Sequence, residues 1–143
     1  MTLIISIPLG AGRTKIIHEP SGTEITSEIA SATGQTFSST DLVAAGLGSC
    51  MSSSIETLAE RHGVPFESII ITVEKETTSE PKRISRLATV IEVSVAYDKK
   101  IHTLFSRAAA TCTVHASLHP DIDAPVEVTF TAQSRRTGLF SKD

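Results

Sequence analysis

The sequence predicts a mixed α+β fold with antiparallel sheets, and three features support that prediction. Short runs of alternating apolar residues lie near both ends and in the middle of the chain, one long segment repeats its apolar residues at helical spacing, and a shorter segment does the same later. The predicted order is three strands, a helix, two strands, a helix and one strand. Strands grouped in this way favour an α+β fold over a parallel α/β sheet.

The first three predicted strands are short and rich in β-branched residues, which favour extended backbone. Gly10-Ala11-Gly12 separates the first two strands, and Ser21-Gly22 separates the second from the third. The expected bounds are residues 3–7, 14–18 and 23–29. Residues 31–39 are rich in Ser, Thr and Gly, so we expect a loop there.

A long helix is predicted from about Thr40 to His62. Hydroxyl side chains precede it, Asp41 places a negative charge in its first turn, and Gly63 stands where helices commonly end in the left-handed conformation. One face of this helix carries an apolar stripe that includes the first cysteine. The stripe comprises Val43, Leu47, Cys50, Met51, Ser54, Ile55 and Leu58.

Gly46 and Gly48 lie inside this predicted helix, where each glycine costs roughly 1 kcal/mol relative to alanine. Such a cost is tolerable where another backbone must approach closely. We therefore expect a second helix to pack tightly against Gly46 and Gly48.

The second half of the chain predicts two more strands, a helix and a last strand. The strands are expected at residues 69–73 and 87–97, with a polar connection over residues 77–85. The helix is expected over residues 99–112, because its apolar residues share one stripe. Alternating apolar residues predict the last strand at residues 126–130.

The length of 143 residues suits one domain. The apolar share of 40% and the charged share of 20% are those of a globular chain rather than a disordered one. We expect a single domain over residues 1–133 and a polar C-terminal tail over residues 134–143.

Charge and hydropathy argue against two classes of partner. The net charge is −3 and the only tight basic cluster is Arg135-Arg136, so no face suited to a nucleic-acid backbone is expected. No run of about 18 apolar residues predicts a membrane span. The first residues are apolar but lack the basic stretch of a secretory signal, so we expect a cytoplasmic protein.

The two cysteines, Cys50 and Cys112, are the candidate reactive residues. In a reducing cytosol such residues are either inert core residues or a redox pair, and both interpretations stay open. A reactive Cys50 would need a cation nearby, because an ordinary thiol is mostly protonated at neutral pH. Arg61 lies on the same helix but about 16 Å along it, too far to act on the thiol. The remaining candidates are Arg13, Arg86 and Arg107.

The histidines do not form a recognisable metal pattern. Cys112, His115 and His119 could in principle hold zinc, but Pro120 is expected to end any helix there and no fourth ligand is evident. We therefore predict no metal and no cofactor.

Two segments resemble the OsmC/Ohr family. Asp41-Leu42, the small residues that follow and Gly48-Ser49-Cys50 are similar to the segment that carries the family's reactive cysteine. The segment from Cys112 through Val114 to Leu118 is similar to the segment of its second cysteine. The resemblance covers residues 16–131.

The resemblance implies an OsmC-like fold in which antiparallel sheets wrap around central helices in an intertwined homodimer. It implies that Cys50 attacks an organic hydroperoxide at the dimer interface, that Cys112 resolves the resulting sulfenic acid, and that Arg13 steadies the thiolate. The implied reductant is a dithiol, such as that of a lipoylated protein.

The chain departs from the family pattern at two positions. Thr40 stands where the hydroperoxide-reducing members carry a Glu that pairs with the Arg, and Thr113 stands where a Pro usually follows the second cysteine. Two other hypotheses therefore stay open. The same fold could bind an apolar ligand while the thiols are idle, or it could be a redox sensor whose disulfide alters a contact with a partner.

Overall fold

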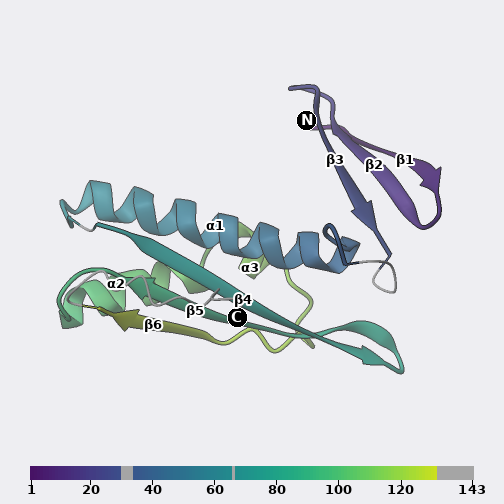
Figure 1. The fold of residues 1–143 in the computed structure, drawn as a ribbon. Helices are drawn as coiled ribbons and strands as arrows, with labels where there is room; N and C mark the ends of the chain where they lie inside the picture. Colours follow the sequence, from purple (N-terminus) through teal and green to yellow (C-terminus); the bar gives the residue numbers. More distant parts are fainter. Residues whose placement is uncertain (30–33, 66, 132–143) are drawn as a thin grey trace, which may run out of the picture. The chain divides into compact units, whose positions relative to one another are not determined.

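The protein is described by a computed structural model (Figure 1). The described residues are 1–29, 34–65 and 67–131. They form two compact units, Met1–Val43 and Ala44–Asp143, and each unit is described by itself. The predicted tail, residues 134–143, lies outside the described residues, and the single domain over residues 1–133 stays a prediction.

The N-terminal unit contains an antiparallel sheet in the strand order β1-β2-β3. Its strands are β1 (Ile4–Gly10), β2 (Arg13–His18) and β3 (Thr23–Glu28). They confirm the three predicted strands, although β1 continues beyond the expected end at residue 7. The β-branched residues pair across the sheet, as Ile5 does with Ile17.

The turn between β1 and β2 requires glycine. Gly10, Ala11 and Gly12 all have positive φ, a region that glycine adopts without a steric penalty. A Cβ atom on Gly12 would lie 2.8 Å from the side chain of Ile29. At Gly10-Ala11-Gly12 the chain therefore turns, and at Gly12 its backbone also lies close to the Ile29 side chain.

The N-terminal sheet lacks an apolar core among its described residues. The buried side chains of the whole N-terminal unit are polar: Ser27, Glu28 and Ser38. Most of the large apolar side chains of this unit are exposed instead, and they comprise Leu3, Ile4, Ile5, Ile7, Leu9, Ile25, Ile29, Phe37 and Val43. Hydrogen bonds hold this sheet together, and the described residues of the unit leave most of its large apolar side chains uncovered.

Helix α1 (Ser39–Arg61) confirms the predicted long helix. It begins with a reciprocal cap in which the Ser38 N–H donates to the Asp41 carboxylate at 2.8 Å and the Asp41 N–H donates to the Ser38 hydroxyl at 3.2 Å. It is followed by Gly63 at φ 62°, as expected for a helix that ends in the left-handed conformation.

The C-terminal unit contains a second sheet in the order β4-β5-β6. β4 (Ile69–Ser79) and β5 (Lys82–Val93) form a long antiparallel hairpin that turns at Glu80-Pro81. The predicted polar connection over residues 77–85 is therefore wrong, because both strands continue into it. At this end the side chains are mostly exposed, so backbone pairing continues without the apolar alternation that a strand prediction needs.

β6 (Val126–Phe130) has the predicted bounds but pairs with β5 in parallel. This pairing corrects the expectation of purely antiparallel sheets. A parallel neighbour needs a crossover connection, and the chain between β5 and β6 supplies one that contains two helices. Figure 1 shows the first of them, α2, beside this sheet.

Helix α2 (Lys99–Ala110) begins after Asp98. The Asp98 carboxylate accepts hydrogen bonds from the N–H groups of Lys100 and Ile101 in the first turn. The prediction of one helix up to residue 112 is wrong at its C-terminal end. Cys112 has extended backbone, with φ −63° and ψ 150°, and it is the N-cap of a separate short helix, α3 (Thr113–Ala116). The chain therefore changes direction at the second cysteine.

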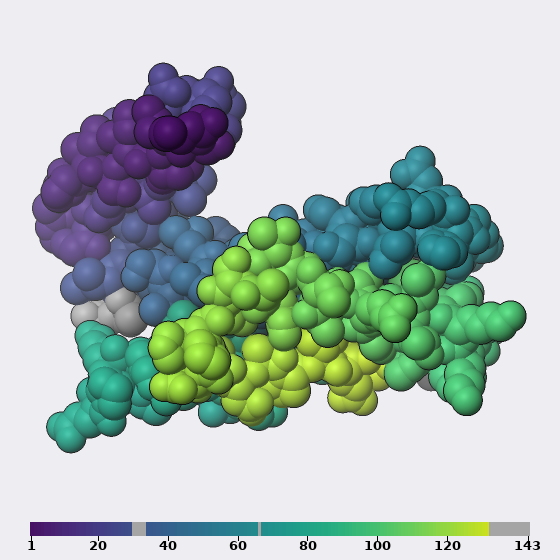
Figure 2. Space-filling view, turned by 180° about the vertical axis from the view of Figure 1, so that it is seen from behind, coloured from purple at the N-terminus to yellow at the C-terminus, as the bar shows by residue number. Residues whose placement is uncertain are grey.

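The core lies in the C-terminal unit, between the sheet and the helices. It comprises Leu47, Met51, Ile55, Ala59, Leu87, Ile91, Val93, Phe105, Ala108, Ala109, Cys112 and Val128. Helix α1 contributes one residue per turn to this core. Figure 2 shows α2 and α3, in green, against the blue residues of α1.

The two glycines inside α1 have different surroundings within the unit. A Cβ atom on Gly48 would lie 3.4 Å from Val73, so Gly48 packs against strand β4 rather than against a helix. The expectation of helix packing is thus wrong for Gly48. Nothing in the described chain lies within 4 Å of a Cβ atom on Gly46, and its packing against another helix stays a prediction.

By length and composition, α1 is the one described helix that could cross a membrane. Length and composition alone are weak evidence for a membrane span, because the core helix of a soluble protein has the same properties. One face of α1 is indeed buried in the core of the C-terminal unit, through Leu47, Met51, Ile55 and Ala59.

Candidate active site

Cys50 lies on α1 at the edge of the buried stripe rather than within it. The fully buried residues on this helix recur every four positions, and Cys50 immediately precedes one of them, Met51. The Cys50 side chain is therefore only partly buried. A thiol in this place contacts the core and still reaches solvent, as a reactive cysteine must.

Cys112 lies at the junction of α2 and α3 and is only 3% exposed. Its sulfur accepts a hydrogen bond from the His115 N–H at 3.4 Å, so the thiol acts as the N-cap of α3. The break between the two helices thus holds this sulfur in a fixed place within the core.

The fold brings the two predicted cysteines together. The Val114 N–H, two residues after Cys112, donates to the Cys50 sulfur at 3.5 Å, and each of the two thiols shifts the pKa of the other. Both cysteines are free thiols in this structure. Residues far apart in the sequence therefore form one compact site, as a redox pair requires.

The two thiols differ in acidity. The Val114 N–H is the main cause of a pKa of the Cys50 thiol below its ordinary value, and burial opposes it. Hydrogen bonds from the Cys112 thiol, the Thr113 N–H and the Ser54 hydroxyl lower the pKa of Cys50 further. Burial raises the pKa of the Cys112 thiol, and the neighbouring Cys50 adds to that increase. Cys50 is therefore the more acidic of the two thiols.

Backbone N–H groups, rather than a cation of the same unit, favour the Cys50 thiolate. Arg86 forms ion pairs with Glu76, at 3.7 Å, and with Asp123, so it is engaged at the exposed end of the hairpin. Arg107 lines a separate pocket of about 350 Å³. Two of the three expected cations are thus placed elsewhere.

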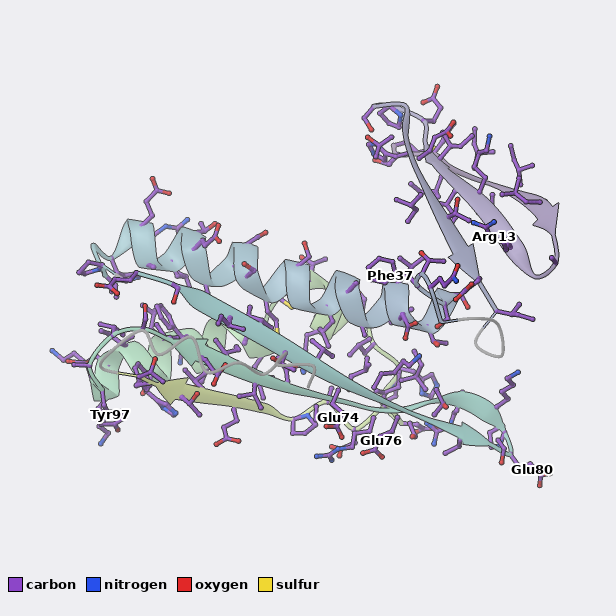
Figure 3. The ribbon with its side chains drawn as sticks, in the orientation of Figure 1. Arg13, Phe37, Glu74, Glu76, Glu80 and Tyr97 are labelled. Atoms are coloured by element: carbon purple, nitrogen blue, oxygen red, sulfur yellow. The ribbon has the colours of Figure 1, made fainter. Side chains whose placement is uncertain are left out.

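Arg13, the third expected cation, lies on β2 of the N-terminal unit (Figure 3). Its predicted role at the Cys50 thiolate stays a prediction. The described structure accounts for the lowered pKa of Cys50 without it, because all the groups that lower this pKa belong to α1 or to residues 112–114.

An open groove of about 640 Å³ runs along α1 past the Cys50 thiol. Its α1 side follows one helical face from Gly46 through Cys50 to Arg61, and Ala108, Thr111 and Val114 form the opposite wall. The groove gives a ligand direct access to Cys50. The sequence prediction excluded Arg61 as an activating cation and did not foresee that it shares this groove.

Two contributions to the site were not recognised in the sequence. Ser54 lies one turn after Cys50, so helical spacing could have indicated it. The Thr113 and Val114 N–H groups have no side-chain signature, because every residue except proline has such a group. Only the path of the chain after Cys112 shows that these donors reach Cys50.

The histidines near the second cysteine have other partners. The His115 ring hydrogen-bonds to the Ala124 carbonyl at 3.1 Å, and the His119 ring accepts from the Asp121 N–H at 3.1 Å. Across residues 1–29, 34–65 and 67–131, no three His, Cys, Asp or Glu residues lie together in a way that could hold a metal ion.

Comparison with known proteins places these features in a family. The family model of OsmC-like proteins matches residues 32–127, which is more than half of the chain. A solved structure from Psychrobacter arcticus 273-4, provisionally named an osmotic stress induced and detoxification response protein, is 32% identical with a TM-score of 0.83. The match covers 90% of this chain and 96% of that one. No curated protein matches the sequence.

More distant structures share the fold. The OsmC-like protein of Mycoplasma pneumoniae is 14% identical, with a TM-score of 0.81 over 92% of this chain and 97% of that one. The organic hydroperoxide resistance protein OhrB of Bacillus subtilis is 17% identical, with a TM-score of 0.69 over 90% of this chain and 98% of that one. The expected OsmC-like α+β fold is confirmed, and the chain belongs to the family of OsmC-like proteins.

Proposed function

We propose that this protein is a thiol peroxidase that reduces organic hydroperoxides in defence against oxidative stress. One observation carries the proposal: the Cys50 thiol lies in an open groove and has a lowered pKa, while the neighbouring Cys112 thiol is buried and has a raised pKa. Cys50 would then be the nucleophile and Cys112 the resolving thiol. Family membership supports a stress-related role, and solved relatives of the same fold include organic hydroperoxide resistance proteins.

The proposed reaction begins at the Cys50 thiolate. Its sulfur attacks the distal oxygen of the hydroperoxide, the O–O bond breaks, and the leaving alkoxide takes up a proton to become an alcohol. Cys50 is now a sulfenic acid. The Cys112 sulfur attacks it, a disulfide forms and water leaves. An external dithiol then reduces the disulfide and becomes a disulfide itself.

The surroundings of the two sulfurs suit these steps. The Val114 N–H holds the Cys50 sulfur at the edge of the groove, where a peroxide can reach it. Cys112 is buried against the core, which protects its thiol from direct oxidation until Cys50 has reacted. Rapid resolution would prevent over-oxidation of Cys50.

We extend the proposal to the partners that the family resemblance implies. Arg13 would steady the Cys50 thiolate, a dithiol of the kind found on lipoylated proteins would be the reductant, and the protein would act as a cytoplasmic homodimer. The exposed apolar side chains of the N-terminal sheet support the homodimer, because a second subunit would cover them. Thr40 removes the carboxylate that usually pairs with the Arg, so the N–H donors at Cys50 carry more of the activation.

The test is to mix reduced protein with one equivalent of tert-butyl hydroperoxide and to follow free thiols and intact mass. We expect both thiols to disappear with a mass loss of two hydrogens. Cys50→Ser should remain unmodified, and Cys112→Ser should gain oxygen and lose activity after one turnover. Wild-type thiols that survive for hours would refute the proposal and favour a ligand-binding role for the groove.

A further inference from the structure

We propose that the short helix α3 is a redox switch, which stays folded while Cys50 and Cys112 are free thiols and loosens when they form a disulfide. The inference rests on the Cys50–Cys112 disulfide of the proposed function, but not on the peroxide that would form it. It identifies the segment that responds to the oxidation state of the two sulfurs and the change that follows in the groove.

The two sulfurs accept hydrogen bonds from the first turn of α3. The Val114 N–H donates to the Cys50 sulfur at 3.5 Å. The His115 N–H donates to the Cys112 sulfur at 3.4 Å. Both donors belong to the N–H groups that a helix leaves without a partner at its N-terminus. The two candidate reactive residues therefore cap the same helix.

Helix α3 has little stability of its own. It contains four residues, Thr113–Ala116, whereas isolated helices shorter than roughly 12–15 residues are marginal in water. None of its four residues is fully buried. The two caps are therefore a large part of what holds α3 in its helical form, and the helix is sensitive to any change in its sulfur acceptors.

A disulfide weakens both caps. Each thiol loses one hydrogen to the oxidant, the two sulfurs share a bond, and each becomes an uncharged sulfur that, like a thioether, is a weak acceptor. Cys50 loses more, because its lowered pKa favours a thiolate, and hydrogen bonds to a charged acceptor are stronger. The two cysteines are free in this structure, so at least one sulfur must also leave its present position to form the bond.

Two contacts of α3 depend on its helical form. Val114 forms part of the groove wall, and the His115 ring hydrogen-bonds to the Ala124 carbonyl at 3.1 Å, shortly before β6. When α3 loosens, Val114 leaves the wall and the groove opens beside the disulfide. The opening matters because Cys112 is buried in the reduced protein, and an external dithiol must reach the disulfide to reduce it.

The test measures amide hydrogen exchange by NMR in the reduced protein and after oxidation with diamide. Diamide joins two thiols without a peroxide, because its N=N bond takes up their two hydrogens. The exchange rates of the Val114 and His115 N–H groups should rise on the order of tenfold, as expected when each loses a hydrogen bond. The N–H groups of Lys100 and Ile101, which the Asp98 carboxylate caps in α2, are the internal control and should keep their rates.

Two variants separate the cap from the disulfide. Cys112→Ser keeps a good N-cap side chain but cannot form the disulfide, so diamide should leave the exchange rates of α3 unchanged. Cys112→Ala removes the cap without any oxidation. Its reduced form should exchange the His115 N–H about as fast as the oxidised wild-type protein does.

The outcomes distinguish this inference from the proposed function. Faster exchange after diamide, in a protein whose thiols do not react with tert-butyl hydroperoxide, would refute the peroxidase and keep the switch. Unchanged or slower exchange, in a protein that has lost two hydrogens by mass, would overturn the switch alone. Thiols that diamide cannot join would overturn the switch together with the resolving role of Cys112.

Discussion

In the C-terminal unit the large apolar side chains pack against one another, whereas in the N-terminal unit most of them face solvent. Every apolar side chain of the described core belongs to residues 44–131. Residues 1–43 instead bury Ser27, Glu28 and Ser38 and expose most of their isoleucines and leucines. Each unit thus has a three-stranded sheet. Within the described residues, an apolar core packs against the sheet of the C-terminal unit but not against that of the N-terminal unit.

The difference bears on where the two candidate thiols lie. Cys50 and Cys112 both belong to the unit that has its own core, so dense packing holds the hydrogen bonds at the Cys50 sulfur in place. A sheet of three strands with an uncovered apolar surface needs another surface for independent stability. Arg13, the residue expected to assist Cys50, belongs to the N-terminal sheet, whose apolar surface is uncovered.

The largest expected effect is on the core. Ile91 is fully buried in the C-terminal unit, and Ile91→Ala should lower the free energy of unfolding by about 2–5 kcal/mol through lost burial and a cavity. Ile25 is 45% exposed on the N-terminal sheet, and Ile25→Ala should cost under about 0.5 kcal/mol at a protein concentration where the chain is monomeric. Urea unfolding of both variants measures the contrast, and equal losses would contradict it.

Self-association should depend on the N-terminal sheet. Ile7 is 43% exposed on the edge strand β1, so its remaining burial by a second subunit would contribute roughly 1 kcal/mol per copy and about twice that in a symmetric dimer. Ile7→Ser should therefore raise the dimer dissociation constant by about tenfold or more in sedimentation experiments. Ile70→Ser, at an exposed site of the C-terminal unit, is the control. If both variants dissociate alike, the N-terminal sheet is not the interface.

A smaller effect is expected inside the C-terminal core. Thr89 is 2% exposed, and its hydroxyl has no hydrogen-bond partner among the described residues. Thr89→Val keeps the shape and removes the unsatisfied group, so it should raise the free energy of unfolding by about 1 kcal/mol. A loss of stability in the same urea titration would mean that the hydroxyl has a partner.

The smallest effect on stability, but a clear one on chemistry, is expected at Thr113. Thr113→Pro removes an N–H that lowers the pKa of Cys50, so this pKa should rise toward its ordinary value. The rate of Cys50 alkylation should then fall at neutral pH, and its pH profile should move to higher pH, because less thiolate is present at each pH below the new pKa.

The substitution fits the backbone, which makes the test specific. Thr113 is the first residue of α3, where proline is well tolerated, and Cys112 already has the extended backbone, at ψ 150°, that a residue before proline prefers. Thr113→Ala keeps the N–H and is the matched control. An unchanged pH profile in the proline variant would show that this donor does not act on Cys50.

Much of the secondary structure could be predicted because its signals are local. Ser38 and Asp41 lie three residues apart and cap α1 as expected, and Gly63 follows its end. The last strand, residues 126–130, has the predicted bounds. The parallel direction of this strand could not be predicted, because it depends on how the chain crosses back after β5 rather than on the residues of the strand.

The candidate site was predictable only in part. The sequence identified both cysteines, and helical spacing placed Cys50 on α1. The predicted source of activation was a cation, whereas the structure has backbone N–H groups at the Cys50 sulfur. The break of the helix at Cys112 was also missed, and that break is what turns the Thr113 and Val114 N–H groups toward Cys50.

The sequence by itself determined where the strands and the two longer helices lie, most clearly both ends of α1, and the two thiols, because helix caps, apolar periodicity and turn glycines act over a few residues. Only the tertiary structure decided which thiol is the acidic one. The sulfur of Cys50 meets the N–H of a residue 64 positions away, and a pKa depends on such contacts in space rather than on neighbours in the chain.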